Sequence, residues 1–334
     1  MDIIHANDVL EELGFVNEVE LFDAEISQET DAEITSNSFS LTIPDSAWEA
    51  RPIMEGHYVY IPKTEYGGKV EEIKHSTAAK TVTVSGLTWR GALYRKVIVP
   101  PEGETHFVVI NQDAHAALLS IIGNSLGANY KISDALSGVA ISWQFRYANA
   151  LTGIYRMLAA AGGALRVDYN QTLKRVEISV APVADYSDLI DLSQDYGVDM
   201  ITTMGGFDRY NHVIALGAGE LLDRDIVHVY RLDDGTITIT SPAWAGTEKD
   251  HVTTYDYTNP ESIEELTKGA IKRLQELNPL NQIEIDPQVE GLTLEMGDIV
   301  GARDRLTGMS GKATVVGKII SISDSGIKEE TRVK

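Results

Sequence analysis

Two glycine-rich stretches come nearest to the spacing of phosphate-binding chemistry. Gly217-Ala218-Gly219 supplies the first two glycines of a dinucleotide-binding turn, in which the backbone closely approaches a pyrophosphate. Leu222, followed by Asp223, stands where the third glycine belongs, and the residues from Leu221 onward indicate a strand and not a phosphate-binding helix. The segment from Gly308 to Lys312 lacks the spacing of a phosphate-binding loop. We therefore expect a β-turn at the first stretch, a hairpin loop at the second, and no cofactor.

The histidines could act as metal ligands or as acid–base groups. No HExxH pair occurs, and no two histidines have the spacing of ligands on a helix. His212 and His228 lie in strands that could pair, so the pattern fits either a metal or acid–base site or the commoner case of polar cross-strand neighbours. We assign no metal ligand. The eight histidines are His5, His57, His75, His106, His115, His212, His228 and His251.

Carboxylate pairs and tryptophans are the remaining candidates for a hydrolytic or sugar-binding site. Adjacent acidic residues are common in so acidic a chain, and we expect them on solvated faces. Isolated tryptophans in β-domains are more often core or interface anchors than sugar platforms. We assign no catalytic residue and expect no enzymatic activity. The residues concerned are Glu71-Glu72, Asp233-Asp234, Glu264-Glu265, Trp89, Trp143 and Trp244.

Composition limits the function classes. The chain has no cysteine, which excludes disulfides, thiolate catalysis and cysteine-based zinc sites. Its 50 acidic and 28 basic residues give a formal net charge of −22. This negative charge disfavours nucleic-acid binding, because the phosphate backbone is also negative. Such a surface suits two roles: keeping the protein in solution, or letting nucleic acid slide past without sticking.

Targeting signals are not evident in the sequence. No window approaches 18 consecutive apolar residues, so no transmembrane segment is expected. The segment from Met1 to Leu10 lacks the basic and apolar regions of a signal peptide. We expect a protein that is made and kept in the cytoplasm.

The elements that must position these side chains begin with a β-domain. Short alternating or β-branched runs, separated by turn residues, fill the first hundred residues. Gly67-Gly68 predicts a hairpin, Thr77-Ala78-Ala79 predicts a turn, and Pro100-Pro101 closes the unit. The predicted strands are Val19 to Ile26, Phe39 to Ile43, Tyr58 to Pro62, Lys69 to His75 and Lys80 to Leu87.

A change of period then predicts an α+β segment. An apolar stripe from Ala114 to Leu126 indicates a helix, capped by Asn111 or Asp113 and stopped by Gly127. A second helix is predicted from Asn149 to Ala161, ending at Gly162-Gly163. A hairpin of Ala164 to Tyr169 and Arg175 to Val180 follows, turning around Asn170-Gln171.

The last third is again rich in β-structure, with one helical interruption. Asn259-Pro260-Glu261 resembles a helix start, the apolar residues from Ile263 to Leu274 form one face, and Asn278-Pro279 ends the helix. Asp233-Asp234-Gly235 predicts a hairpin turn. The predicted strands are Met200 to Met204, Arg209 to Leu216, Asp225 to Leu232, Thr236 to Thr240, Gln282 to Ile285, Asp298 to Ala302, Ala313 to Ser323 and a short one near Ile327.

The two β-rich ends show a weak internal repeat. Ser38 to Pro44 and Gly56 to Ile61 follow one another much as Gln282 to Pro287 and Gly297 to Val300 do, with similar order and spacing but different residues. Two readings stay open: a pair of related β-barrels, or the loose match that any two strand meanders give.

Three blocks resemble a known family. The first is similar to a recurrent block of prophage tail proteins in the siphophage tail-hub (tail-associated) family, the second to the end of that family's first barrel, and the third to its last barrel. They occur in that family's order and at its spacing, and the resemblance spans nearly the whole chain. The blocks are Asn211 to Leu221 with Asp223-Arg224 and Ile226 to Tyr230; Leu87 to Arg95 with Val97 to Pro101; and Met296 to Arg305 with Thr307-Gly308.

The resemblance implies a fold and a domain plan. The family's hub resembles the central hub protein of contractile-phage baseplates, with two barrels per subunit assembled as a trimer into a pseudo-sixfold ring. The fold class it implies is mainly β with an α+β insert. A first antiparallel β-barrel is expected at 1–105, the α+β insert at 106–198, and a second barrel at 199–334 with a helical insertion at 242–280.

The resemblance also implies a function. It predicts a virion structural protein of the tail tip or baseplate hub, which continues the tail tube and lets DNA pass without specific binding. The expected partners are further copies of the chain, distal tail and tail-tip proteins, and the tape-measure protein. Larger relatives carry a C-terminal peptidase or glycosidase extension, which we do not expect after Lys334. A phage cell-wall hydrolase and a carbohydrate-binding receptor module remain as alternatives.

Overall fold

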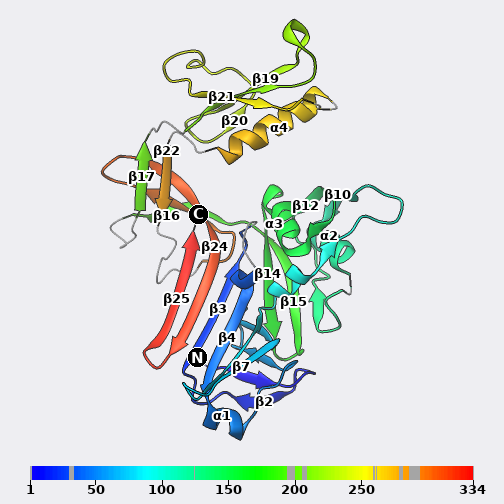
Figure 1. The fold of residues 1–334 in the computed structure, drawn as a ribbon, viewed down its shortest axis with the longest axis vertical. Coiled ribbons are helices and arrows are strands. Elements are labelled where there is room, and N and C mark those ends of the chain that lie inside the picture. Colours follow the sequence, from blue (N-terminus) through cyan, green and yellow to red (C-terminus); the bar gives the residue numbers. More distant parts are fainter. Residues whose placement is uncertain are drawn as a thin grey trace. The chain divides into compact units, whose positions relative to one another are not determined.

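The computed structural model describes residues 2–29, 34–123, 125–193, 200–204, 209–258, 260, 262–277, 281–285 and 294–333 (Figure 1). It is mainly β, as the sequence predicts. The chain divides into two compact units. Unit 1 comprises Met1–Val198, Asp286–Ala302 and Lys312–Lys334, and unit 2 comprises Asp199–Ile285 and Arg303–Gly311.

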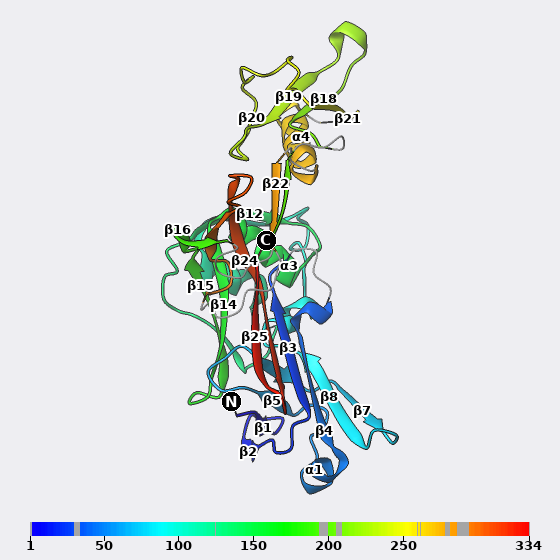
Figure 2. The same ribbon diagram turned by 90° about the vertical axis from the view of Figure 1, so that its left-hand side faces the viewer.

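A long sheet in unit 1 joins strands from both ends of the chain. Its order is β16-β23-β24-β3-β4-β8-β7, and β25 also pairs with β24. Figure 2 shows β24 and β25 beside β3 and β4, and Gly317 of β24 lies opposite Ser27 of β3. The strands are β3 (Leu21–Ser27), β4 (Ser38–Pro44), β7 (Glu72–Ser76), β8 (Thr81–Leu87), β16 (Asp185–Leu192), β23 (Ile299–Arg303), β24 (Ser310–Ser323) and β25 (Gly326–Val333).

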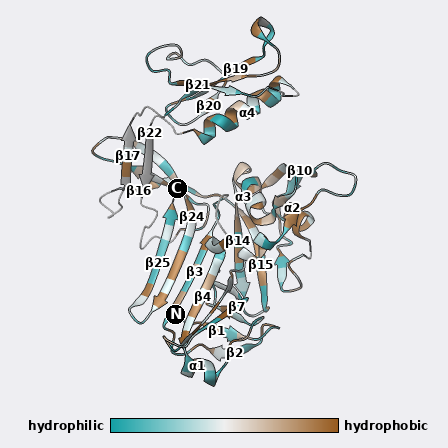
Figure 3. Cartoon of the chain, in the orientation of Figure 1, coloured by the Kyte–Doolittle hydropathy of each residue, from teal (hydrophilic) through white to brown (hydrophobic). Residues whose placement is uncertain are grey.

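Alternating burial shows why a segment such as β4 forms a strand. Buried and partly buried residues alternate along β4, so one face packs on the core while the other stays more polar. Figure 3 shows the corresponding alternation of brown and teal along the strands. Phe22 and Phe39, with ring centroids 6.4 Å apart, meet Leu41, Val84 and Ile320 in the core under this sheet.

A second sheet of unit 1 covers the same core. Its order is β2-β1-β5-β6, from β1 (Ile4–Ala6), β2 (Glu12–Phe15), β5 (Tyr58–Tyr60) and β6 (Gly67–Lys69). Gly68 forms an isolated bridge to Thr88, at the end of β8. A Cβ on Gly68 would lie 2.0 Å from the Leu87 carbonyl oxygen, so only glycine allows this approach. The bridge therefore links the two sheets.

The predicted hairpin forms between β5 and β6, but the position of its turn was wrong, because Gly67 and Gly68 both belong to β6. The turn between β5 and β6 lies earlier and is closed by the Ile61 amide, which donates to the Tyr66 carbonyl. The glycines serve close backbone approach and not chain reversal. The predicted turn at Thr77-Ala78-Ala79 is confirmed.

Helices and short strands form the rest of unit 1. Asp113, one of the two predicted caps, caps α2 (Ala114–Ile122). Asn149, predicted as the first residue of the second helix, is instead the cap of α3 (Ala150–Ala160). The helix α2 ends at Gly123, with φ of 53°, and not at the predicted Gly127. The hairpin of β14 (Gly163–Asn170) and β15 (Arg175–Pro182) is confirmed. The remaining elements are α1 (Asp45–Ala50), β9 (Val97–Ile98), β10 (Phe107–Asp113), β11 (Tyr130–Ile132), β12 (Ala140–Phe145), β13 (Ala148–Asn149) and the 3-10 turns Ile34–Asn37 and Gly91–Arg95.

Unit 2 packs one helix on a four-stranded sheet of order β20-β19-β18-β21. Leu266, Ala270 and Leu274 of the helix α4 meet Val213 and Val229 in its core. The elements are β17 (Met200–Met204), β18 (His212–Leu216), the 3-10 turn Leu221–Asp223, β19 (Ile226–Arg231), β20 (Ile237–Thr238), β21 (Val252–Asp256), α4 (Ile263–Glu276) and β22 (Asn281–Ile285), which pairs with β17.

Two features of unit 2 differ from the sequence prediction. The strand β21, parallel to β18, was not predicted. The cap of α4 is Ser262, whose hydroxyl accepts from the Glu265 amide at 3.2 Å. The predicted start residues Asn259 and Glu261, and the predicted stop at Asn278-Pro279, lie outside the described residues.

The sheets follow open paths, and the expected pair of barrels stays a prediction. None of the helices that the structure describes is long and apolar enough to cross a membrane.

Candidate functional site

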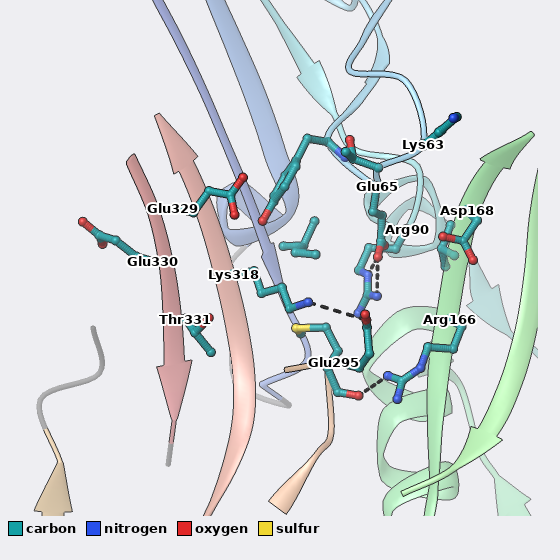
Figure 4. A pocket seen from close by; sticks show the side chains of 15 residues that line it. Lys63, Glu65, Arg90, Arg166, Asp168, Glu295, Lys318, Glu329, Glu330 and Thr331 are labelled. Carbon is teal, nitrogen blue, oxygen red and sulfur yellow. Dashed lines mark hydrogen bonds and ion pairs between the residues drawn. The ribbon is translucent and has the colours of Figure 1, made fainter. Parts of the chain in front are cut away.

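A charged pocket of about 440 Å³ lies in unit 1 (Figure 4). Its walls are the β5–β6 connection around Glu65, the strand β14, and the long strands β24 and β25. Five carboxylates and four cationic side chains line it: Glu65, Asp168, Glu295, Glu329, Glu330, Lys63, Arg90, Arg166 and Lys318.

A buried ion pair forms the inner end of this pocket. Arg90, 1% exposed, donates from Nε and Nη2 to both carboxylate oxygens of Glu65. Its Nη1 donates to the Tyr155 hydroxyl at 3.3 Å, and that hydroxyl donates to the Ser27 carbonyl at 2.9 Å. Burial raises the pKa of Glu65 and the Arg90 guanidinium opposes that rise. Because a guanidinium does not lose its proton in proteins, we take the pair as ionic. It ties the β5–β6 connection to α3 and β3.

The outer pocket carries a second group of charges. Lys318 lies 3.5 Å from the Glu295 carboxylate, and Arg166 donates to the Met296 carbonyl. Burial and the negative charge of Glu295 raise the pKa of Asp168. The described lining contains no histidine, serine or cysteine that could act as a nucleophile with its base. A carboxyl of raised pKa near a second carboxylate is, however, an arrangement that acid–base hydrolysis uses.

A histidine relay lies in unit 2. The structure brings His212 and His228 together across β18 and β19, with His212 Nε2 2.9 Å from His228 Nδ1. Asp250, which the sequence analysis missed, lies 2.8 Å from His212 Nδ1. Its other carboxylate oxygen accepts from the Gly246 amide at 2.7 Å.

The hydrogen-bond pattern fixes the protons of this relay. The Asp250 carboxylate only accepts, so His212 donates from Nδ1. His212 Nε2 then accepts from His228 Nδ1, which leaves a lone pair on the exposed His228 Nε2. Burial and the neighbouring His212 lower the pKa of His228. No group of three or more metal-ligating side chains is found within the described ranges.

Two other histidines have structural partners. His115 accepts from the Val180 amide at Nε2 and donates from Nδ1 to the Ala135 carbonyl, which joins α2 to β15. His5, in β1, donates to His57 at 2.8 Å. These contacts brace the fold.

The first glycine-rich stretch is a turn, as predicted, and the second lies only partly in a loop. The amide of Gly217 donates to the Asp225 carbonyl, and the amide of Asp225 donates to the Ala218 carbonyl. These two hydrogen bonds close the β18–β19 hairpin. The Leu221–Asp223 turn, and not the strand expected from Leu221 onward, follows. Gly308 lies in the β23–β24 connection, while Ser310 to Lys312 already belong to β24.

The carboxylate pairs are divided among unrelated surface contacts. Glu71 and Glu72 pair with Arg95 and Lys74, respectively. Asp234 accepts from the Thr236 amide in the predicted hairpin turn. The Tyr257 hydroxyl donates to Glu265 of the third pair. These carboxylates do not meet in one site.

The tryptophans differ from one another. Trp89 is buried between Tyr58 and Tyr169, with ring centroids at 5.6 and 5.0 Å, as expected of a core anchor. Trp143 packs partly against the same core. Trp244 lies instead in the irregular segment ahead of β21, beside an open hollow of unit 2.

The fold is that of prophage tail proteins. It matches the 43 kDa tail protein of prophage MuSo2 from Shewanella oneidensis, with a TM-score of 0.58 at 14% identity over 100% of this chain and 98% of that one. It also matches prophage tail protein gp18 from Listeria monocytogenes, with a TM-score of 0.56 at 13% identity over 100% of this chain and 94% of that one. The tail protein from Neisseria meningitidis matches with a TM-score of 0.53 at 15% identity over 100% of this chain and 97% of that one. Neither a protein-family model nor a curated protein sequence matches the chain. The predicted resemblance to phage tail proteins is confirmed at the level of the fold.

Proposed function

We propose that this protein is a structural component of a phage tail tip, a hub that forms a ring continuous with the tail tube. The observation that carries the proposal is the likeness in fold to three prophage tail proteins along the entire chain. In this role the subunits form a homotrimer, contact distal tail and tape-measure proteins, and let DNA pass during ejection. The virion tail is the corresponding location.

Features of unit 1 support a ring-forming role. The long sheet and the β2-β1-β5-β6 sheet share one core and are linked at Gly68 and Thr88, as the wall of a first barrel requires. The C-terminal strands β24 and β25 belong to the same long sheet. The division that we propose is a first barrel at 1–105, an α+β insert at 106–198 and a second barrel at 199–334. The net charge of −22 provides few counterion-releasing contacts for passing DNA.

The charged pocket supports a role without chemistry. The inner charges, Glu65 and Arg90, satisfy each other, and Lys318 and Arg166 are engaged by neighbouring acceptors. Most of the pocket's charge is therefore used to join segments of the chain. The raised pKa of Asp168 is the one observation that favours the second candidate, a cell-wall hydrolase.

Oligomeric state is the test of the hub. Light scattering after size-exclusion chromatography, over a concentration series and with negative-stain imaging, should show a trimer with a central opening. A monomer at every concentration, including in the presence of the neighbouring tail proteins, would contradict the proposal.

Hydrolysis is tested separately. Purified peptidoglycan incubated with the protein should release no reducing sugars or new amino groups above background. If it does, and Asp168→Asn abolishes the release, the hydrolase replaces the structural hub.

A further inference from the structure

Unit 2 contains an open hollow of about 580 Å³ that the hub role does not use. The segment around Trp244 and Lys249 forms one side, and Asn211 at the start of β18 and Asp233 in the β19–β20 turn form the other. Its volume falls within the range of small-molecule sites. All its lining residues belong to unit 2.

The polypeptide that forms the hollow is held in one conformation by side chains. Asn211 donates to the Lys249 carbonyl at 2.9 Å and accepts from the His251 amide at 2.8 Å. Asp250 holds the Gly246 amide at 2.7 Å and His212 Nδ1 at 2.8 Å. A loop fixed in advance does not need to be ordered when a ligand arrives, which favours binding. The histidine relay thus acts here as a brace.

Trp244 is positioned by packing but does not belong to the core of unit 2. Its ring lies 5.8 Å from that of Tyr230, at 77°, and Tyr230 stacks on His212 at 4.3 Å. The described core cluster, made of β18, β19 and α4 side chains, does not include Trp244. The indole is partly exposed and lines the hollow. A large aromatic side chain held rigidly at a concave surface provides an apolar platform for a ligand.

The polar groups beside this platform are available for a ligand. Asp233, Glu248 and Lys249 are exposed, and the structure gives none of their side chains a partner among the described residues. The set offers carboxylate acceptors, an ammonium donor and the His251 ring. Because both signs of charge are present, the set does not select a strongly charged ligand. It suits a neutral molecule with many hydroxyls and an apolar face.

We propose that this hollow binds a saccharide, with Trp244 against the apolar face of a sugar ring and Asp233, Glu248 and Lys249 hydrogen-bonded to its hydroxyls. The proposal needs only unit 2 and stands apart from the ring. Failure of trimerisation and failure of sugar binding are therefore separate results.

The test uses the full chain and a panel of soluble neutral oligosaccharides: triacetylchitotriose, maltotriose, lactose and mannotriose. Saturation-transfer NMR identifies a binder, and isothermal titration calorimetry gives its Kd. We expect at least one sugar to bind, Trp244→Ala to weaken it at least tenfold, and Glu248→Gln to weaken it about threefold. Tyr147→Ala, at an exposed aromatic residue of unit 1, is the matched control and should stay within twofold of the parent.

Folding of each variant is checked by circular dichroism, and the exposed Glu248 provides a second readout if Trp244→Ala disturbs the loop. The proposal is overturned if no sugar of the panel binds at 10 mM, or if both variants bind as the parent does. It is also overturned if trilysine binds at the hollow in place of the sugars, because the site would then recognise a cationic side chain.

Discussion

Acidification should destabilise unit 1 through His5. This side chain in β1 is 1% exposed. The Met54 amide donates to His57 Nδ1, so His5 Nε2 donates to that same nitrogen, and His5 Nδ1 has no partner. Burial, His57 and Arg51 together lower the pKa of His5 from 6.5 to about 4. A protonated His5 would be a buried cation near the Arg51 guanidinium.

The sign and size of the effect follow from proton linkage. The folded state has the lower pKa, so the unfolded state binds this proton first as the pH falls. The stability present above pH 6.5 is therefore lost progressively as the pH falls to about 4. Each tenfold change in proton affinity is worth about 1.4 kcal/mol, and the whole interval is worth about 3 kcal/mol.

Urea unfolding of the parent and of His5→Leu, at pH 7 and at pH 4, measures this contribution. Three of the four tryptophans, Trp48, Trp89 and Trp143, lie in unit 1 and report on it. All other titrating groups are common to both proteins. Between pH 7 and pH 4, the free energy of unfolding should therefore fall by about 3 kcal/mol more in the parent than in the variant. His106→Gln, at a partly exposed histidine, should behave as the parent does. The reasoning fails if His5→Leu loses as much stability as the parent.

Three substitutions test the packing of unit 1, each by the free energy of urea unfolding. Arg90→Met should cost about 3–5 kcal/mol because Glu65 would remain as a buried unpaired charge. Adding Glu65→Gln to this variant should recover part of the lost stability. If the single and the double variant lose the same stability, the ion pair is refuted. Gly68→Ala should cost about 3 kcal/mol, since its Cβ would meet the Leu87 carbonyl, and a neutral result would refute that contact. Asn149→Ala should cost about 1–2 kcal/mol through loss of the α3 cap, with a loss of helical circular dichroism; no change would show that the cap is redundant.

Local patterns predicted most strands and the cap of α2. Alternation along β4 and a cap residue such as Asp113 depend on interactions within a few residues, which the sequence contains. The glycines Gly67-Gly68 were misassigned because a tight turn and a close approach to a distant strand require the same absence of a side chain. The strand β21 was missed because its pairing with β18 is parallel and lies across a long connection.

The side-chain sites were less predictable because they depend on tertiary contacts. The sequence indicated that the strands of His212 and His228 could pair, but Asp250 lies in an irregular segment with no periodicity. Glu65 and Arg90 lie in different connections, and nothing in their spacing shows that both are buried together. Trp244 was expected in a core or an interface, and only the structure places it beside a hollow.

The pairing of β3 with β24 has a consequence for biosynthesis. Strand β3 is translated early. Its partner β24, which contains Gly317, is translated only after most of the chain. Until then β3 is an open edge with apolar side chains such as Phe22 and Ile26 and with unpaired backbone groups, which can pair with another nascent chain. Contacts so distant in sequence also form slowly. The long sheet can therefore be completed only late in translation, and the interval before completion is when this protein is most exposed to aggregation.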